Sequence, residues 1–414
     1  MPSFRDHVPA PSDPRIAALR GLGWREYGRV ARTDSFAGPM IEGWSRLYPA
    51  EFRGITADGT LRTGLFPRSA VPVEQAAPTA TMVAAARAML AGMPPRVTDR
   101  MRHPVDAVEW QSWSNPEFVQ HDTGVRLEEL PVSGREAILA LVRASLSPAG
   151  YELVRNLMRI NGFLGDVVGL PALMNEFSYH FALYGTPSAT APWGWQLFGH
   201  HVALNVLVDD RRMVATPVFL AAEPSSVDAG PHAGTTVFDR RIALARSLIT
   251  SLPPDLQERA VLYPKLVDPA MPPGRIHPGD ERHLAGCFQD NRIIPYEGVG
   301  VAAMGDAARD RLVQLVEECI GYLPDGPRAR RMDEVSRHLS DTWFCWMGGT
   351  DSGDPFYLRV QSPVIIVEID HHCGVFLTNT EPAAFHLHTV VRTPNGNDYG
   401  RSLVQQSAAG GPVR

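Results

Sequence analysis

The 414-residue sequence lacks the features that mark membrane, secreted and nucleic-acid-binding proteins. No stretch approaches 18 consecutive apolar residues, so no membrane-spanning helix is expected. The first residues, MPSFRDHVPAPSDPRI, contain no apolar segment of the kind found in a secretory signal. Runs of basic residues are also absent, and the formal net charge is −6. We therefore expect neither a membrane nor a nucleic acid as a partner.

Cysteine is scarce, and several familiar catalytic motifs are missing. The four cysteines are scattered without a CxxC pair. In a chain of this length they do not form a disulfide framework, so we expect free thiols and a cytoplasmic location. The sequence has no HExxH, no P-loop, no GxSxG and no GxGxxG after a strand. These absences argue against the protease, NTPase, α/β-hydrolase and dinucleotide-binding classes.

Helical and strand-like patterns occupy different parts of the chain. Helical patterns occur at 79–93, 134–159 (broken at Ser147-Pro148), 239–252, 306–323 and the start of 330–348. Strand-like stretches occur at 199–208, 213–222, 356–372 and 386–393. Because the two kinds are clustered rather than alternating, we predict an α+β fold. Its core would be antiparallel and strand-rich, with strand pairs near 199–222 and 356–393 and surrounding helices.

The domain organisation follows from the same patterns. Residues 1–75 look irregular, and no internal repeat is evident. We expect an N-terminal extension at 1–50, a single large domain at 51–405 and a flexible tail at 406–414.

The stretch HLH, at His386 to His388, is the first candidate for a metal site. On a strand, alternate side chains share a face, so two imidazoles would stand side by side with Arg392 on the same face. Both rings could reach one ion, and imidazole suits zinc, iron and copper. An HLH pair alone is also compatible with a structural role.

A second group of ligands lies in an earlier hairpin. His200 and His201 are adjacent and would point to opposite faces of a strand, and we expect His201 to face the polar side. Glu223 stands at the end of the following strand, directly before a proline. We predict that one or both of these histidines, Glu223, His386 and His388 hold a divalent transition metal. Zinc is the first expectation, with iron and copper as alternatives.

Two carboxylates lie in strongly apolar surroundings. Glu368 is part of VIIVEID, and Glu176 is part of LMNEFSYHF. A buried carboxylate must be paired, coordinated or neutral. We expect one of them to act as a general base with a pKa raised by its surroundings. By contrast, His371 and His372 precede a turn and are expected to be exposed.

Arg392 and the turn that follows it have two interpretations each. Arg392 would either grip a substrate carboxylate or form a salt bridge with Asp398. Asp398 and Tyr399 follow the turn Pro394-Asn395-Gly396-Asn397. They would either orient a metal-binding histidine or cap the turn.

Several long motifs occur together and in order: FRGITADGTLRTGLFP, LVRASLSPAGYELVRNLM, YGTPSATAPWGWQLFGHHVALNVLV, TPVFLAAEP, DTWFCWMGG and HLHTVVRTPNGNDYG. From about Phe52 to Leu403 the chain resembles the family catalogued as domain of unknown function 3500. The resemblance implies one family-defining unit and no particular reaction. It also implies that the motifs concentrate at Gly194 to His201, at Thr216 to Pro224 and at the HLH stretch.

Together these observations predict a metal-dependent enzyme that acts on a small, anionic organic molecule. The default reaction is hydrolysis of a C–N or C–O bond by metal-activated water. A non-haem iron or copper oxidoreductase is the first alternative, because histidines with a carboxylate also bind those metals. A non-catalytic protein that binds a small ligand is the second alternative.

Overall fold

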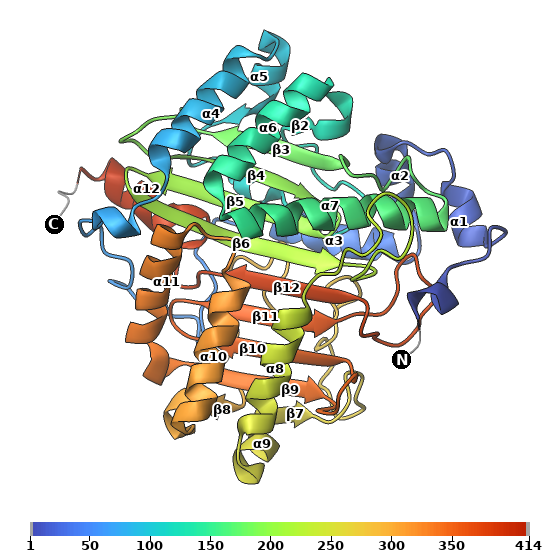
Figure 1. The fold of residues 1–414 in the computed structure, drawn as a ribbon, viewed down its shortest axis with the longest axis vertical. Coiled ribbons are helices and arrows are strands. Elements are labelled where there is room, and N and C mark those ends of the chain that lie inside the picture. The colour runs from blue at the N-terminus through green and yellow to red at the C-terminus, as the bar shows by residue number, and fades with distance from the viewer. Residues whose placement is uncertain (1–2, 411–414) are drawn as a thin grey trace.

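A twelve-stranded sheet runs through the middle of the molecule in the computed structural model, which describes residues 3–410 (Figure 1). Its strand order is β1-β3-β4-β5-β6-β12-β11-β10-β9-β7, with β2 also paired to β3 and β8 to β9. Only the β1–β3 and β7–β9 pairs are parallel. Helices surround this mostly antiparallel sheet, which confirms the predicted α+β fold.

The first half of the sheet is built by helices followed by a four-stranded meander. In chain order the elements are α4 (Thr79–Ala91), α5 (Pro95–Met101), β1 (Arg102–His103), β2 (Val125–Arg126), α6 (Val132–Ser145), α7 (Pro148–Val168), β3 (Tyr179–Tyr184), β4 (Trp193–Gly199), β5 (Val202–Asp209) and β6 (Arg212–Ala222).

The second half repeats that order, although no repeat is evident in the sequence. Its elements are α8 (Asp239–Ser251), α9 (Pro254–Ala260), β7 (Val261–Tyr263), β8 (Val299–Gly300), α10 (Asp306–Cys319), α11 (Asp325–Arg337), β9 (Trp343–Gly348), β10 (Phe356–Gln361), β11 (Ile366–His371) and β12 (Leu387–Arg392). The strand pairings repeat as well, and the halves meet where β6 pairs antiparallel with β12. Figure 1 shows these two strands, far apart in the sequence, side by side at the centre.

The remaining helices flank this double unit. They are α1 (Pro14–Leu19), α2 (Trp24–Ala31), α3 (Ala37–Leu47) and α12 (Arg401–Ala408). The expected irregularity of residues 1–75 is therefore wrong for 14–47, where three helices form. The last four residues of the expected flexible tail lie outside the described part of the chain.

Both faces of the sheet are covered by apolar side chains. One core lies between the sheet and the helices drawn in front of it in Figure 1, and includes Leu157, Leu315 and Val367. The other core lies on the opposite face and includes Trp44 of α3 and Phe219 of β6. The alternation of side chains along each strand therefore sends residues into two different cores.

Local sequence explains where several elements begin and end. The helix α7 starts at the expected break, because Ser147 accepts a hydrogen bond from the Gly150 amide and Pro148 is at the first helical position. It ends at Gly169, whose φ of 75° is readily adopted by glycine. The expected strand 356–372 is two strands, since Ser362-Pro363 interrupts it between β10 and β11.

No helix among residues 3–410 has both the length and the apolar character needed to cross a membrane. All four cysteines are free thiols, and only Cys373 is partly exposed.

Candidate metal centre

The predicted strand face carrying His388 is confirmed. Leu387 and Val391 of β12 pack into the core under the helices, whereas Val390 packs into the opposite core. His388 lies on the same side as Val390, with its ring 5.1 Å from that of Phe219. His386 directly precedes β12, and its ring lies 4.7 Å from that of His388. The pleat of the strand therefore brings the two rings together.

His200 and His201 occupy a different kind of position from the one expected. They form the two-residue turn between β4 and β5 rather than part of a strand. His201 has a φ of 66°, which a turn residue can adopt. Outside the strand the rings need not alternate, and they stack with centroids 3.7 Å apart. The expectation that the two side chains face opposite ways is wrong.

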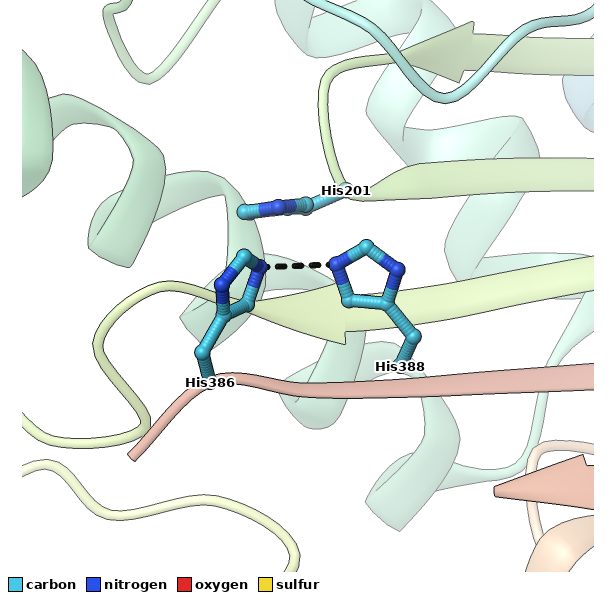
Figure 2. Close-up of side chains that lie close together, drawn as sticks. All are labelled: His201, His386 and His388. Atoms are coloured by element: carbon cyan, nitrogen blue, oxygen red, sulfur yellow. Dashed lines mark hydrogen bonds between the residues drawn. The ribbon is translucent and has the colours of Figure 1, made fainter. Parts of the chain in front are cut away.

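Three of these histidines converge on one point. The possible ligand atoms of His201, His386 and His388 all lie within 4.8 Å of one another. Figure 2 shows the ring of His201, from the β4–β5 turn, lying over the rings of His386 and His388. All three side chains are buried. The convergence that the sequence suggested for these three residues is present.

The hydrogen bonds of His386 indicate which of its nitrogens is free. Its Nδ1 lies 2.7 Å from the carbonyl oxygen of Cys373, which places the proton on Nδ1. The Nε2 lone pair then faces Nε2 of His388 at 2.8 Å. Burial lowers the pKa of both rings and of His201 well below the usual value for histidine. These imidazoles are therefore neutral, which is the form that binds metals.

Glu223 and His200 lie at one side of this triad. The possible ligand atoms of His200, His201 and Glu223 also lie within 4.8 Å of one another. One Glu223 oxygen accepts hydrogen bonds from the backbone amides of Val375 and Leu377. Within residues 3–410 its other oxygen has no hydrogen-bond partner. Burial raises the pKa of Glu223 to about 8.

His283 and His372 lie at the other side, and the sequence did not suggest either as a ligand. Their possible ligand atoms and one of His388 lie within 4.8 Å of one another. The expectation that His372 is exposed is wrong, because its side chain is buried and its ring stacks on that of His388 at 3.7 Å. His371 is also buried, on the opposite face of β11, where its Nδ1 lies 3.0 Å from the Phe356 carbonyl oxygen.

A signal for His372 existed in the sequence, whereas one for His283 did not. His372 has the same strand parity as Glu368 and Asp370, both of which point to the site's face of the sheet. His283 lies in the long segment between β7 and β8, where no periodicity predicts the direction of a side chain.

Residues 75–401 match the family described as a protein of unknown function (DUF3500). The chain belongs to this family. A search of curated proteins found no match, and a search of solved structures found none either. In this DUF3500 protein, the three motif stretches singled out in the sequence supply His201, Glu223, His386 and His388, and so meet at one site.

Glu368 has a partner that the sequence did not reveal. It accepts hydrogen bonds from the amides of Leu284 and Ala285 and from the Tyr357 hydroxyl, at 2.9, 2.8 and 2.6 Å. Its other neighbour is His283, whose Nδ1 lies 3.5 Å from a Glu368 oxygen. Burial alone would raise the pKa of Glu368, but bonding to His283 and the nearby positive charges lower it to about 2. The expected raised pKa is therefore wrong.

The other expected base, Glu176, does not reach the histidines of this DUF3500 protein. Its carboxylate pairs with Arg155 and lies 3.8 Å from Nε of Arg159, both on α7. Its side chain is partly exposed, and it belongs to none of the groups of converging ligand atoms in the described residues.

Arg392 forms the local ion pair, which is one of its two predicted roles. Its Nε donates to Asp398 at 2.8 Å, and its other nitrogens donate to Asp290 and to the carbonyl oxygens of Ala285 and Gly286. The side chain is fully buried. With its donors used in this way, Arg392 is not available to bind a substrate.

Asp398 and Tyr399 belong to the same network as Arg392. Asp398 also accepts from the Thr393 amide at 2.7 Å, so it caps the turn. The Tyr399 hydroxyl donates to Asp290 and accepts from the Trp113 indole. Neither residue orients a histidine of the site, and the turn-capping interpretation is the one present.

Proposed function

We propose that this protein is a metal-dependent enzyme whose ion is held by His201, His386 and His388. The observation that carries the proposal is the convergence of three buried, neutral imidazoles, two of them with Nε2 atoms 2.8 Å apart. Two nitrogens bound to one tetrahedral zinc ion lie about 3.3 Å apart. Small ring rotations would therefore admit the ion, which would replace the hydrogen bond that joins the two nitrogens.

The unpartnered atoms around the triad support binding rather than a purely structural role. In the described chain, Nδ1 of His201 and one oxygen of Glu223 are buried without a hydrogen-bond partner. Each such atom costs about 1–3 kcal/mol. A protein that used these residues for packing alone would be more stable with apolar side chains here. A bound cation offsets the cost, because it gives the nitrogen and carboxylate lone pairs a partner.

The arrangement suits activation of water. Three histidine ligands leave a fourth position for a water molecule, whose pKa falls to about 7 on zinc. Hydrolysis then adds the hydroxide oxygen to the substrate carbon, breaks a C–N or C–O bond and transfers a proton to the leaving group. Glu223 lies beside His201 and is the carboxylate placed to take the proton from water or to become a further ligand.

A small anionic substrate remains part of the proposal, with a different cationic group. Arg275 is buried, has no hydrogen-bond partner for its Nε within residues 3–410, and lies 5.3 Å from the centre of the Tyr357 ring. The Tyr357 hydroxyl donates to Glu368, which is next to His283. The terminal nitrogens of Arg275 donate to the Arg282 carbonyl oxygen and to the Met347 sulfur, so only Nε of this cation is left to contact a substrate.

Access to the site passes the segment that joins β11 and β12. Its backbone bonds to Glu223 and His386, so it covers the histidines. A surface pocket of about 420 Å³ adjoins the segment and is lined by Pro355, Glu381 and Pro382 among others. The amide of Ala383, next to this lining, donates to the carbonyl oxygen of His372. Movement of the segment would open a route from this pocket to the ligands.

An iron- or copper-dependent oxidoreductase is the second candidate. The observation that favours it is the nitrogen-rich donor set: among the described residues, the two groups that contain His201 bring together four buried histidines and one carboxylate, Glu223. Copper binds well to such imidazole sets. A protein that binds a small ligand without catalysis is the third candidate.

Metal analysis of the purified full chain tests the proposal. We expect about one or more equivalents of a transition metal, and about one equivalent less in His386→Asn than in the wild type. The matched control is His232→Asn, a histidine outside the converging groups, which should keep the wild-type content. Zinc would support hydrolysis, and stoichiometric iron or copper would support oxidation. Wild-type protein that holds less than about 0.2 equivalents after incubation with these metals would refute a metal-dependent function.

Removal of the ion provides an independent measurement. An ion present at a thousand times its Kd stabilises the folded protein by about 4 kcal/mol. Chelation should therefore lower the free energy of unfolding of the wild type by at least that amount, and that of His386→Asn by less. An unchanged wild type would indicate that the histidines serve packing or ligand binding instead.

A further inference from the structure

We propose that a second metal ion binds beside the first, held by His283, His372 and His388, so that the two ions share the His388 ring. The inference rests on the proposed function, because it places the second ion next to the one assigned to His201, His386 and His388.

The second triad meets the same distance criterion as the first, although its rings are stacked or moderately tilted rather than steeply tilted to one another. The possible ligand atoms of His283, His372 and His388 lie within 4.8 Å of one another, and all three side chains are buried. The rings of His283 and His388 are nearly parallel, at 11°, with centroids 6.1 Å apart. The ring of His372 lies 5.5 Å from that of His283 and 3.7 Å from that of His388. Because imidazole lone pairs lie in the plane of the ring, the stacked His372 ring must rotate to direct a nitrogen at the same ion as His388 and His283.

A buried carboxylate faces one nitrogen of His283, although within residues 3–410 that nitrogen makes no hydrogen bond. This nitrogen, Nδ1, faces Glu368 at 3.5 Å, and Glu368 is itself fixed by the Leu284 and Ala285 amides and the Tyr357 hydroxyl. A carboxylate behind one ring nitrogen orients the ring and makes the other nitrogen a better ligand. In the part of the chain that the structure describes, Nε2 of His283 has no hydrogen-bond partner. This buried, unpartnered nitrogen is the second observation that points to an ion.

His388 has the two nitrogens that a shared ligand requires. Its Nε2 faces His386, and Figure 2 shows its other nitrogen on the far side of the ring from His386. That nitrogen, Nδ1, is buried without a hydrogen-bond partner among residues 3–410. A ring that binds one ion through each nitrogen gives up its N–H proton to solvent. The same side chain can therefore belong to both triads at once.

Acidic groups beside His372 supply negative charge for a second divalent ion. Its Nε2 lies 3.1 Å from an Asp370 oxygen, and its Nδ1 lies 3.6 Å from a Glu281 oxygen. Asp370 and Glu281 are anchored by Arg282. Ions on opposite nitrogens of one imidazole ring lie about 6 Å apart, since each Zn–N bond is about 2.0–2.1 Å. That separation is too large for a single oxygen atom to bridge, so the substrate class that suits this centre is a small organic anion with two oxygen atoms, such as a carboxylate, with one oxygen facing each ion.

Zinc titration of metal-free full-length protein, followed by mass spectrometry of the bound metal, tests the proposal. We expect two equivalents in the wild type, one in His283→Asn and one in His372→Asn. Because His388 is the ligand shared by both ions, we expect His388→Asn to lose both. The matched control is His371→Asn, the neighbour on the opposite face of β11, which should keep both. Because His283→Asn leaves Glu368 without its partner, the double variant with Glu368→Gln is measured too, and circular dichroism identifies the folded proteins.

The outcomes separate the two proposals. One equivalent in the wild type, retained in His283→Asn and His372→Asn, would overturn the second ion and leave the first. No equivalent in the wild type would overturn both. One equivalent that is lost in His283→Asn but kept in His386→Asn would overturn both as well, because a single ion would then sit at the other triad.

Discussion

Replacing Arg392 by methionine distinguishes the two roles that the sequence left open. The guanidinium is fully buried and donates to Asp398, Asp290 and two backbone carbonyls. Methionine keeps much of the side-chain volume but removes the charge. Two buried carboxylates then lose their cation. We expect the variant to be less stable while its metal content is unchanged, because no atom of Arg392 is among the converging ligands.

The size of the stability loss depends on which hydrogen bonds Asp398 and Asp290 keep in the variant. Breaking a buried ion pair by removing one member typically costs about 3–5 kcal/mol. Asp398 keeps the Thr393 amide as a donor, and Asp290 keeps the Tyr399 hydroxyl. Burial already raises the pKa of Asp398, so protonation of that acid limits the cost. We therefore expect a loss of about 3–5 kcal/mol in the free energy of unfolding, toward the lower end.

Urea unfolding followed by tryptophan fluorescence measures this change. The control is Arg46→Met, which breaks an exposed pair with Glu42 whose side chains are 72% and 68% exposed. Such a pair contributes about 0.5 kcal/mol or less. If Arg392→Met is no less stable than Arg46→Met, the buried network does not stabilise the fold. That result would favour the other predicted role of Arg392, binding of a substrate carboxylate.

Two further predictions concern stability. Burial lowers the pKa of His180 to about 3, so the folded state holds it neutral, whereas the unfolded chain protonates it below about pH 6.5. The contribution of His180 to the free energy of unfolding is complete above pH 6.5 and falls by about 1.4 kcal/mol for each pH unit below it. Between pH 7.5 and 5.5, His180→Gln should therefore lose about 1.4 kcal/mol less of its unfolding free energy than the wild type. The same pH dependence in both proteins would contradict the lowered pKa. At Gly124, φ is +74° and a Cβ would lie 2.0 Å from the Phe181 carbonyl oxygen, whereas at Gly230, with φ of +79°, nothing lies within 4 Å. In urea unfolding, we expect Gly230→Ala to lose about 1 kcal/mol of stability and Gly124→Ala to lose at least about 2 kcal/mol more. Equal losses in the two variants would rule out the clash at Gly124.

Local patterns were sufficient for much of the secondary structure. Helical spacing located α4, α6, α8 and α10, and the break at Ser147-Pro148 separates α6 from α7 as expected. These features depend on side chains only a few residues apart, so they can be predicted from the sequence alone. Helices α1 to α3 were missed, although α2 and α3 have a more pronounced apolar face than α4 or α6. Their spacing of apolar residues, which buries Trp44 of α3 in the core, was a signal that the sequence contained.

The duplication of the fold was not visible in the sequence. Both halves run through the same helices and strands, but the residues at matching places differ. In the first half the last two strands are joined by the turn Asp210-Arg211, and in the second by residues 372–386. This longer connection carries the backbone groups that bond to Glu223 and His386. The centre is therefore built at a place where the two halves are unlike.

The sequence by itself determined which side of β12 carries His388 and which side of β11 carries Glu368 and Asp370, since side chains alternate along any strand. The partners across the site were decided only by the tertiary structure. Pairing of β6 with β12 brings Glu223 near His386, the β4–β5 turn places His201 over them, and the segment before β8 adds His283. These contacts join residues far apart in the chain, so they depend on which strands become neighbours. For the same reason Arg392 and Glu368, both plausible catalytic groups in the sequence, are held by partners that only the fold supplies.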